Sequence, residues 1–92
     1  MRTIHKFPLK LTDDQTIELP DGAKILSVQW QMNGLMLWAL VDCHNALTPR
    51  HVMIRGTGHD VPDYAVEHIS TVITECGGLV WHVFERFPHE RK

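Results

Sequence analysis

Histidine is the residue most able to bring chemistry to this chain, because its side chain titrates near neutral pH and binds metal ions. The chain of 92 residues holds seven histidines and two cysteines. Their spacing contains no Cys-x-x-Cys, His-x-His or His-Glu-x-x-His pattern, which are spacings typical of zinc sites. A composite site from His59, His68 and His82 is geometrically conceivable. We expect instead scattered or hydrogen-bonded histidines, with no bound metal and no cofactor.

The segment Gly56-Thr57-Gly58-His59 has the composition of an anion-binding loop. Two glycines around a threonine let the backbone approach a ligand closely and expose consecutive amide donors. It is not a dinucleotide-binding fingerprint, because the third glycine and the following helix are missing. A bulge and turn that ends a strand is the alternative interpretation. The hypothesis predicts these ligand-binding residues: Arg55 as a planar fork for phosphate or carboxylate, Thr57, Gly58, His59 and, from a neighbouring strand, His82.

The sequence contains no strong pattern for a catalytic nucleophile or for an acid–base pair. Cys43 and Cys76 lack a surrounding nucleophile signature, and we expect them to be reduced, small hydrophobic side chains near strand ends. Acid–base chemistry by His59, Asp60 and His82 is the alternative, which would make the protein a small hydrolase or nucleotide-modifying enzyme. Because turns favour aspartate for conformational reasons alone, we expect no catalytic residue and no enzymatic activity.

The elements that must position these residues are strands, because apolar residues recur with a period of two and no sustained 3.6-residue stripe occurs. We predict strands at residues 2–7, 16–19, 51–55, 68–75 and 79–87, and a hairpin over 24–42. Residues 44–50 are expected to form a loop, and 61–67 either a loop or one short helical turn. The fold class is therefore all-β: a small antiparallel β-sandwich or open barrel of six to seven strands, forming one domain over 1–87 with a charged tail at 88–92.

The hairpin carries the sharpest structural prediction. Asn33-Gly34 is a strong signal for a two-residue type I′ turn, which would place Met32 opposite Leu35 and Trp30 opposite Leu37. The face predicted to be core is Leu26, Val28, Trp30, Met32, Leu35, Leu37, Ala39 and Val41. The opposite face is polar on one strand and apolar on the other, so it is either covered or used against a partner. The predicted interface residues are Gln29, Gln31, Met36, Trp38 and Leu40. A second two-residue turn at Gly77-Gly78 would place His82 opposite Ile73.

Composition limits the function classes. The formal charge is −2, from 9 basic and 11 acidic residues, with 43% hydrophobic and 22% charged residues. These values are typical of a globular domain and do not favour a nucleic-acid partner. No apolar run approaches the roughly 20 residues that span a bilayer, so no membrane partner is expected. The N-terminus shows no apolar signal segment, which indicates an intracellular domain.

Five blocks in order along residues 3–85 resemble an uncharacterised family of short tailed-phage and prophage proteins (a domain of unknown function). The blocks are 3–9 (TIHKFPL), 22–29 (GAKILSVQ), 37–42 (LWALVD), 56–59 (GTGH) and 80–85 (VWHVFE). The resemblance implies a phage origin and action in the host cytoplasm, and it supplies no catalytic residues.

From this resemblance we expect a non-enzymatic binding protein, an inhibitor of host defence. It would either cap a host protein through the Trp38 face, or act as a homo-oligomer that sequesters a small anionic, nucleotide-like signal with Arg55, Thr57 and His59. A minor virion or assembly protein is the third alternative.

Overall fold

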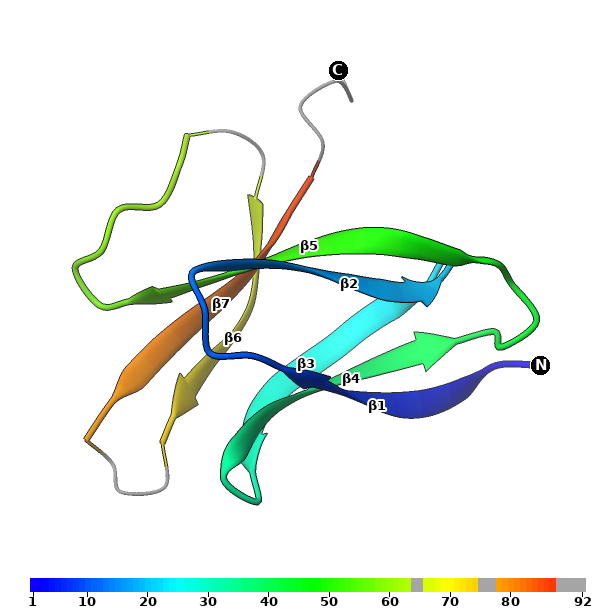
Figure 1. Cartoon of the computed structure of the whole chain (residues 1–92), viewed down its shortest axis with the longest axis horizontal. Helices are drawn as coiled ribbons and strands as arrows, with labels where there is room; N and C mark the ends of the chain where they lie inside the picture. The colour runs from blue at the N-terminus through cyan, green and yellow to red at the C-terminus, as the bar shows by residue number, and fades with distance from the viewer. Residues whose placement is uncertain (64–65, 75–77, 88–92) are drawn as a thin grey trace.

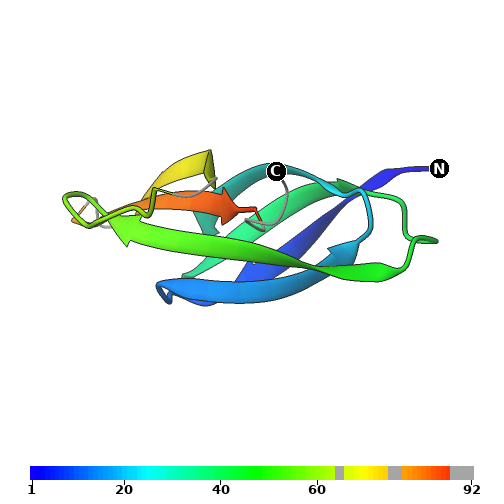
Figure 2. The same ribbon diagram turned by 90° about the horizontal axis from the view of Figure 1, so that it is seen from above.

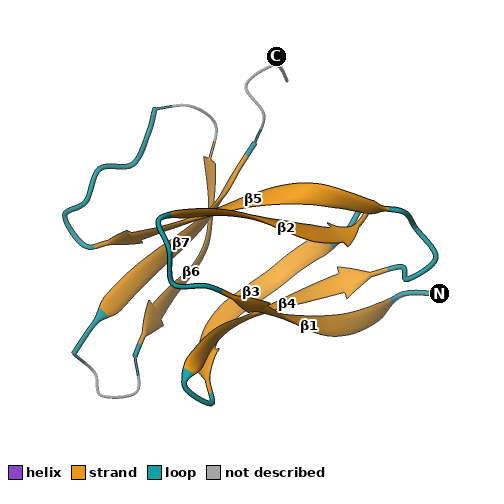
Figure 3. Ribbon diagram, in the orientation of Figure 1, coloured by secondary structure: helices purple, strands orange, loops and turns teal. Residues whose placement is uncertain are grey.

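The computed structural model describes residues 1–63, 66–74 and 78–87, and within them the chain is all-β (Figure 3). No helix occurs in this part of the chain, so the helical turn considered for 61–67 is absent from its described residues. The strands are β1 Thr3–Leu9, β2 Asp14–Pro20, β3 Lys24–Gln31, β4 Gly34–Val41, β5 Leu47–Gly56, β6 Val66–Ile73 and β7 Val80–Arg86.

Two antiparallel sheets make up the fold (Figure 1). Sheet A has the order β1-β4-β3, and sheet B has the order β2-β5-β7-β6. Seen from above, the molecule is thin, and the strands lie in layers (Figure 2). Where β3 lies beside β6, the backbone N–H of Val28 donates to Ser70 Oγ at 2.9 Å, but no ladder joins the two strands. The sheets therefore do not close into a barrel, and the predicted fold class, an all-β antiparallel sandwich or open barrel of six to seven strands, is confirmed.

The core lies between the two sheets. From sheet A it receives the odd-numbered residues of β4, since Leu37, Ala39 and Val41 are fully buried. From sheet B it receives alternate residues of β5 and β7, including Val52, Ile54 and Val83. The remaining buried members are Leu9, Leu19, Ala23, Val28, Leu35 and Val72, with Phe7, Ile17, Ile25, Trp30, Ile69 and Trp81 packed against them.

The pairing register predicted for the hairpin is wrong, although most of its side chains lie on the predicted face of the sheet. The two turn residues are Met32 and Asn33, with φ values of 51° and 69°, and Gly34 begins β4. Trp30 pairs with Leu35, not with Leu37. Each pairing partner therefore moves by two residues, and a shift of two keeps every side chain on its own face. Packing along the whole of β4, which also pairs with β1, decides this register over the local preference for an Asn-Gly turn.

Two residues predicted to lie in the core, Met32 and Leu26, are exposed for different reasons. Met32 is 85% exposed, because it lies in the turn. Leu26 is 42% exposed, because a bulge between Ile25 and Ser27 interrupts the alternation of β3. Ile25 takes the core position instead and pairs with Ala39. A bulge places one extra residue against its partner strand, so the face assignment inverts on one side of it.

Other boundaries differ from prediction because of long-range pairing. The predicted loop 44–50 is wrong at its end, since β5 begins at Leu47 and Pro49 pairs with Glu18. Proline is tolerated there because β7 joins β5 only from His51 onward, so Pro49 has one ladder neighbour. Pro8 lies inside β1, which is an edge strand. The predicted turn at 76–78 and the tail 88–92 lie wholly or mainly outside the described residues.

Candidate functional site

Arg55, the predicted anion fork, is occupied by contacts within the chain. Its Nε donates to the carbonyl of Asp60 at 3.0 Å, and its Nη1 donates to the carbonyl of Asp13 at 2.6 Å. Nη2 lies 3.6 Å from the Asp14 carboxylate, and the arginine side chain is only 15% exposed. Arg55 thus ties the glycine loop to the β1–β2 turn, and its charge already faces a carboxylate.

The glycine loop is held in a tight turn. The backbone N–H of His59 donates to the carbonyl of Gly56 at 3.0 Å, and the N–H of Gly56 donates to His59 Nδ1 at 3.1 Å. A Cβ at position 56 would lie 3.0 Å from His59 Cε1, so the imidazole covers this glycine closely. Gly58 has a φ of 90°, a conformation that glycine adopts without steric cost. The turn therefore consumes two of the amide donors that the anion hypothesis required, those of Gly56 and His59.

His82 lies beside this loop, as predicted, but its cross-strand partner is different. It pairs with Arg55 on one side and with Thr71, not Ile73, on the other. Its Nε2 lies 2.8 Å from Thr57 Oγ1, and its Nδ1 lies 3.2 Å from Thr71 Oγ1. Thr71 Oγ1 in turn lies 3.0 Å from His68 Nε2. Threonine hydroxyls both donate and accept, so this chain of four side chains can be satisfied by either tautomer of His82.

The structure brings together some of the predicted histidines and not others. His82 and His68 share Thr71, whereas the hydrogen bonds of His59 go to Gly56. Within the described residues, no group of three or more histidine, cysteine, aspartate or glutamate side chains is arranged to hold a metal ion. Neutral hydroxyls orient His82, where a general base is commonly oriented by a carboxylate. These two hydrogen bonds fix the orientation of the His82 ring.

The predicted interface residues lie together on the outer face of sheet A. Along the central strand β4, the half-buried side chains of Met36, Trp38 and Leu40 alternate with fully or almost fully buried core residues. On β3, Gln29 pairs with Met36 and Ser27 pairs with Trp38, while Gln31 pairs with Gly34. Trp30 packs against the core, so the two indoles point to opposite sides of the sheet. No described strand packs over this outer face.

Strand β1 supplies part of this face that local sequence patterns did not reveal. Ile4 pairs with Leu40, Lys6 with Trp38 and Pro8 with Met36, and Ile4 is 56% exposed. Lys6 Nζ donates to Gln31 Oε1 at 2.9 Å, a contact that reaches from β1 to β3 across β4. The pairing of β1 with β4 joins residues about 35 positions apart, so hairpin patterns could not find it.

Two further clusters were not predicted as sites. Cys43 is an exposed free thiol, contrary to the small hydrophobic role expected of it, and its Sγ lies 3.7 Å from His5 Nε2. Arg50 and Glu85 form an ion pair on the inner side of sheet B, and Arg50 Nη1 donates to the carbonyl of Ala23 at 2.8 Å. That pair lines a cleft of about 430 Å³ between β3 and β6.

The Asp42 carboxyl lies in the turn that follows β4. The backbone N–H of His44 donates to Asp42 Oδ1 at 3.1 Å, and this bond lowers the pKa of Asp42 below its ordinary value of 3.8. The His44 side chain lies 3.4 Å from the same oxygen. These contacts hold the turn after β4, next to the end of the Trp38 face.

A domain of unknown function, DUF7352, matches residues 1–92. The chain belongs to this family. A comparison of the DUF7352 chain with curated proteins and a comparison with solved structures each gave no match. No helix long and apolar enough to cross a membrane occurs among the described residues.

Proposed function

We propose that this chain is a phage-encoded, non-enzymatic binding protein that caps a host protein, and that it does so through the outer face of sheet A. The observation that carries the proposal is the stripe of Met36, Trp38 and Leu40 on the central strand, half-buried and without a described strand over it. Interfaces are enriched in aromatic residues and methionine, and a central tryptophan is a common source of binding energy. The phage origin rests on the five sequence blocks that resemble phage and prophage proteins.

The contacts of Arg55 favour this mode over sequestration of a small anion. Arg55 donates three hydrogen bonds to backbone carbonyls, and a carboxylate lies next to it. An anion would have to displace these contacts before it could use the guanidinium. The enzyme alternative is also less well supported, since His59 binds the backbone of its own turn and the described contacts place no carboxylate on His82.

Affinity purification from host cells tests the proposal. Tagged wild type should retain a host protein, and Trp38→Ala should reduce that retention about 30-fold or more, the loss expected for a central tryptophan. Ile73→Ala is the matched control, because Ile73 is 61% exposed on sheet B. A second variant, Leu40→Ala, and thermal melts of all variants separate loss of binding from loss of folding.

Equal retention by wild type and Trp38→Ala, at unchanged melting temperature, would refute the capping face. Conversion of a nucleotide into new products by the purified protein would refute the absence of catalysis. For the role in the host, a phage carrying Trp38→Ala should plate like a deletion phage on hosts where the deletion has a defect. Wild-type plating by the Trp38→Ala phage there would contradict that role.

A further inference from the structure

Charge is distributed unevenly between the two sheets. The three strands of sheet A contain no aspartate or glutamate, whereas the strands of sheet B contain Asp14, Glu18, Glu67 and Glu85. The whole chain has 11 acidic and 9 basic residues, so composition alone would place carboxylates on both sheets. Sheet A is therefore a basic surface on a protein with a net negative charge.

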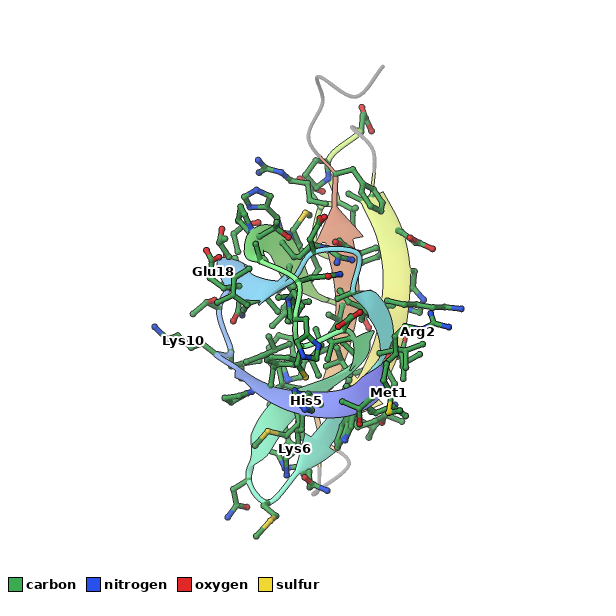
Figure 4. The ribbon with its side chains drawn as sticks, turned by 90° about the vertical axis from the view of Figure 1, so that its right-hand side faces the viewer. Met1, Arg2, His5, Lys6, Lys10 and Glu18 are labelled. Carbon is green, nitrogen blue, oxygen red and sulfur yellow. The ribbon has the colours of Figure 1, made fainter. Side chains whose placement is uncertain are left out.

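The basic side chains flank the apolar stripe. Lys6 pairs with Trp38 from β1, and Lys24 pairs with Leu40 from β3, so one lysine lies on each side of the central strand. Both lysines are exposed. Arg2 and Lys10 lie just before and just after β1 at the same spacing of four, and Figure 4 shows Arg2, Lys6 and Lys10 spread along this edge, with Glu18 apart on β2. The face thus has an apolar centre and a mostly basic rim, with the partly exposed Asp42 carboxylate just beyond the end of β4.

From this arrangement we infer that the partner of the outer face of sheet A is a protein segment with carboxylates on both sides of an apolar centre. The inference rests on the proposed function and adds the chemistry of the partner. Opposite charges at the rim of an interface speed association and exclude wrong partners, because like charges brought together are costly. The same argument disfavours a two-fold pairing of this face with a second copy, in which Lys6 and Lys24 would meet other lysines.

A nucleic acid is the other polyanion that such a face could meet. Single-stranded nucleic acid is held by several aromatic side chains on which successive bases stack. The outer face of sheet A offers one indole, Trp38, and its other central side chains are aliphatic or thioether. A segment with its own apolar side chains fits this centre better than a stack of bases does.

Fluorescence anisotropy with synthetic probes tests the inference. The acidic probe is a labelled peptide of about ten residues with leucine, tryptophan and valine at its centre and glutamates on both sides, long enough to span a strand. Its matched probe has lysine in place of each glutamate, and a third probe is oligo-dT of about 15 nucleotides. The protein variants are Lys6→Gln with Lys24→Gln, and a control, Leu47→Glu with Ile73→Glu, that changes net charge equally on exposed positions of sheet B.

The acidic peptide should bind wild type, weaken as salt rises from about 0.05 to 0.5 M, and weaken about tenfold in the lysine variant. The sheet B control should stay within about twofold of wild type. Equal binding of the lysine peptide, tighter binding of oligo-dT, or no binding of the acidic peptide at about 1 mM would overturn the inference. Sedimentation showing a dimer that Lys6→Gln with Lys24→Gln strengthens would overturn it in favour of a second copy. If Trp38→Ala abolishes binding of the host protein but Lys6→Gln with Lys24→Gln binds it as wild type does, the capping function stands and this inference fails.

Discussion

Removing the ion pair between Glu85 and Arg50 should lower the free energy of unfolding substantially. The Glu85 carboxylate accepts two hydrogen bonds from the Arg50 guanidinium, through Nε and through Nη2, the latter at 3.0 Å. Because Arg50 also donates to the carbonyl of Ala23, immediately before β3, the pair connects sheet B to the start of a sheet A strand. The substitution Glu85→Gln keeps the shape of the side chain and removes its charge, so it isolates the electrostatic part of this connection.

The size of the effect follows from burial. The Glu85 side chain is 7% exposed and the Arg50 side chain 21%. Removing one partner of a buried ion pair typically costs 3–5 kcal/mol, because the other charge is left uncompensated. Water can still reach part of Arg50, which retains its bond to Ala23, so we expect a loss of about 2–4 kcal/mol for Glu85→Gln. In a chain of this size that corresponds to a fall in melting temperature of about 10–25 °C.

Urea unfolding of four proteins measures this effect: wild type, Glu85→Gln, Arg50→Met and the double variant. The double variant should lose less than the sum of the single losses, with a coupling energy of about 1–3 kcal/mol, because the second substitution removes the charge that the first one stranded. Glu18→Gln, an exposed residue on β2, is the control and should change stability by less than about 0.5 kcal/mol. Single losses below about 1 kcal/mol that add without coupling would refute the reasoning.

Two further predictions concern the ends of β4. Met32→Asn should raise the free energy of unfolding by about 1 kcal/mol, because asparagine adopts the left-handed conformation of Met32 more readily than methionine does; a lower urea midpoint would contradict this. The Asp42 carboxyl should titrate below 3.8, since the His44 backbone N–H stabilises its charged form. Its stabilising contribution is present above the pKa of the unfolded chain and is lost as pH falls through the lowered folded-state pKa. An NMR titration midpoint of Asp42 at or above 3.8 would contradict the assignment.

Alternation together with the pairing predicted at Asn33-Gly34 was sufficient to predict most of the faces that the hairpin buries. That pairing assigned Trp30 and Trp38 to opposite sides, and the assignment is correct because the register was wrong by two residues, which leaves each side chain on its own face. The exact register could not be predicted from Asn33-Gly34, because β4 is a central strand whose position is also fixed by its ladder with β1. The bulge between Ile25 and Ser27 was likewise not predicted, because the alternation of residues 24–32 contains no interruption that marks it.

The contacts of Arg55 could not be predicted from the sequence. The residue types of its loop are those of an anion-binding site, and no pattern in the sequence indicates that Arg55 contacts the β1–β2 turn instead. The carbonyl of Asp13 and the carboxylate of Asp14 reach Arg55 only because β2 pairs with β5, which joins segments about 40 residues apart. The hydrogen bond between Thr71 and His82 was also not predictable, because it depends on the register between β6 and β7.

The basic rim of sheet A could be predicted only in part. The sequence shows that its basic residues share one face of a strand, and the fold shows which face that is. The spacing of Arg2, Lys6 and Lys10 places all three on one face of a strand, by the same alternation that predicts the hairpin faces. Only the antiparallel pairing of β1 with β4 shows that this face is the one that carries Trp38. The basic residues near β1 and the apolar residues of β4 thereby form one surface. Only the combined surface indicates a partner that is both acidic and apolar.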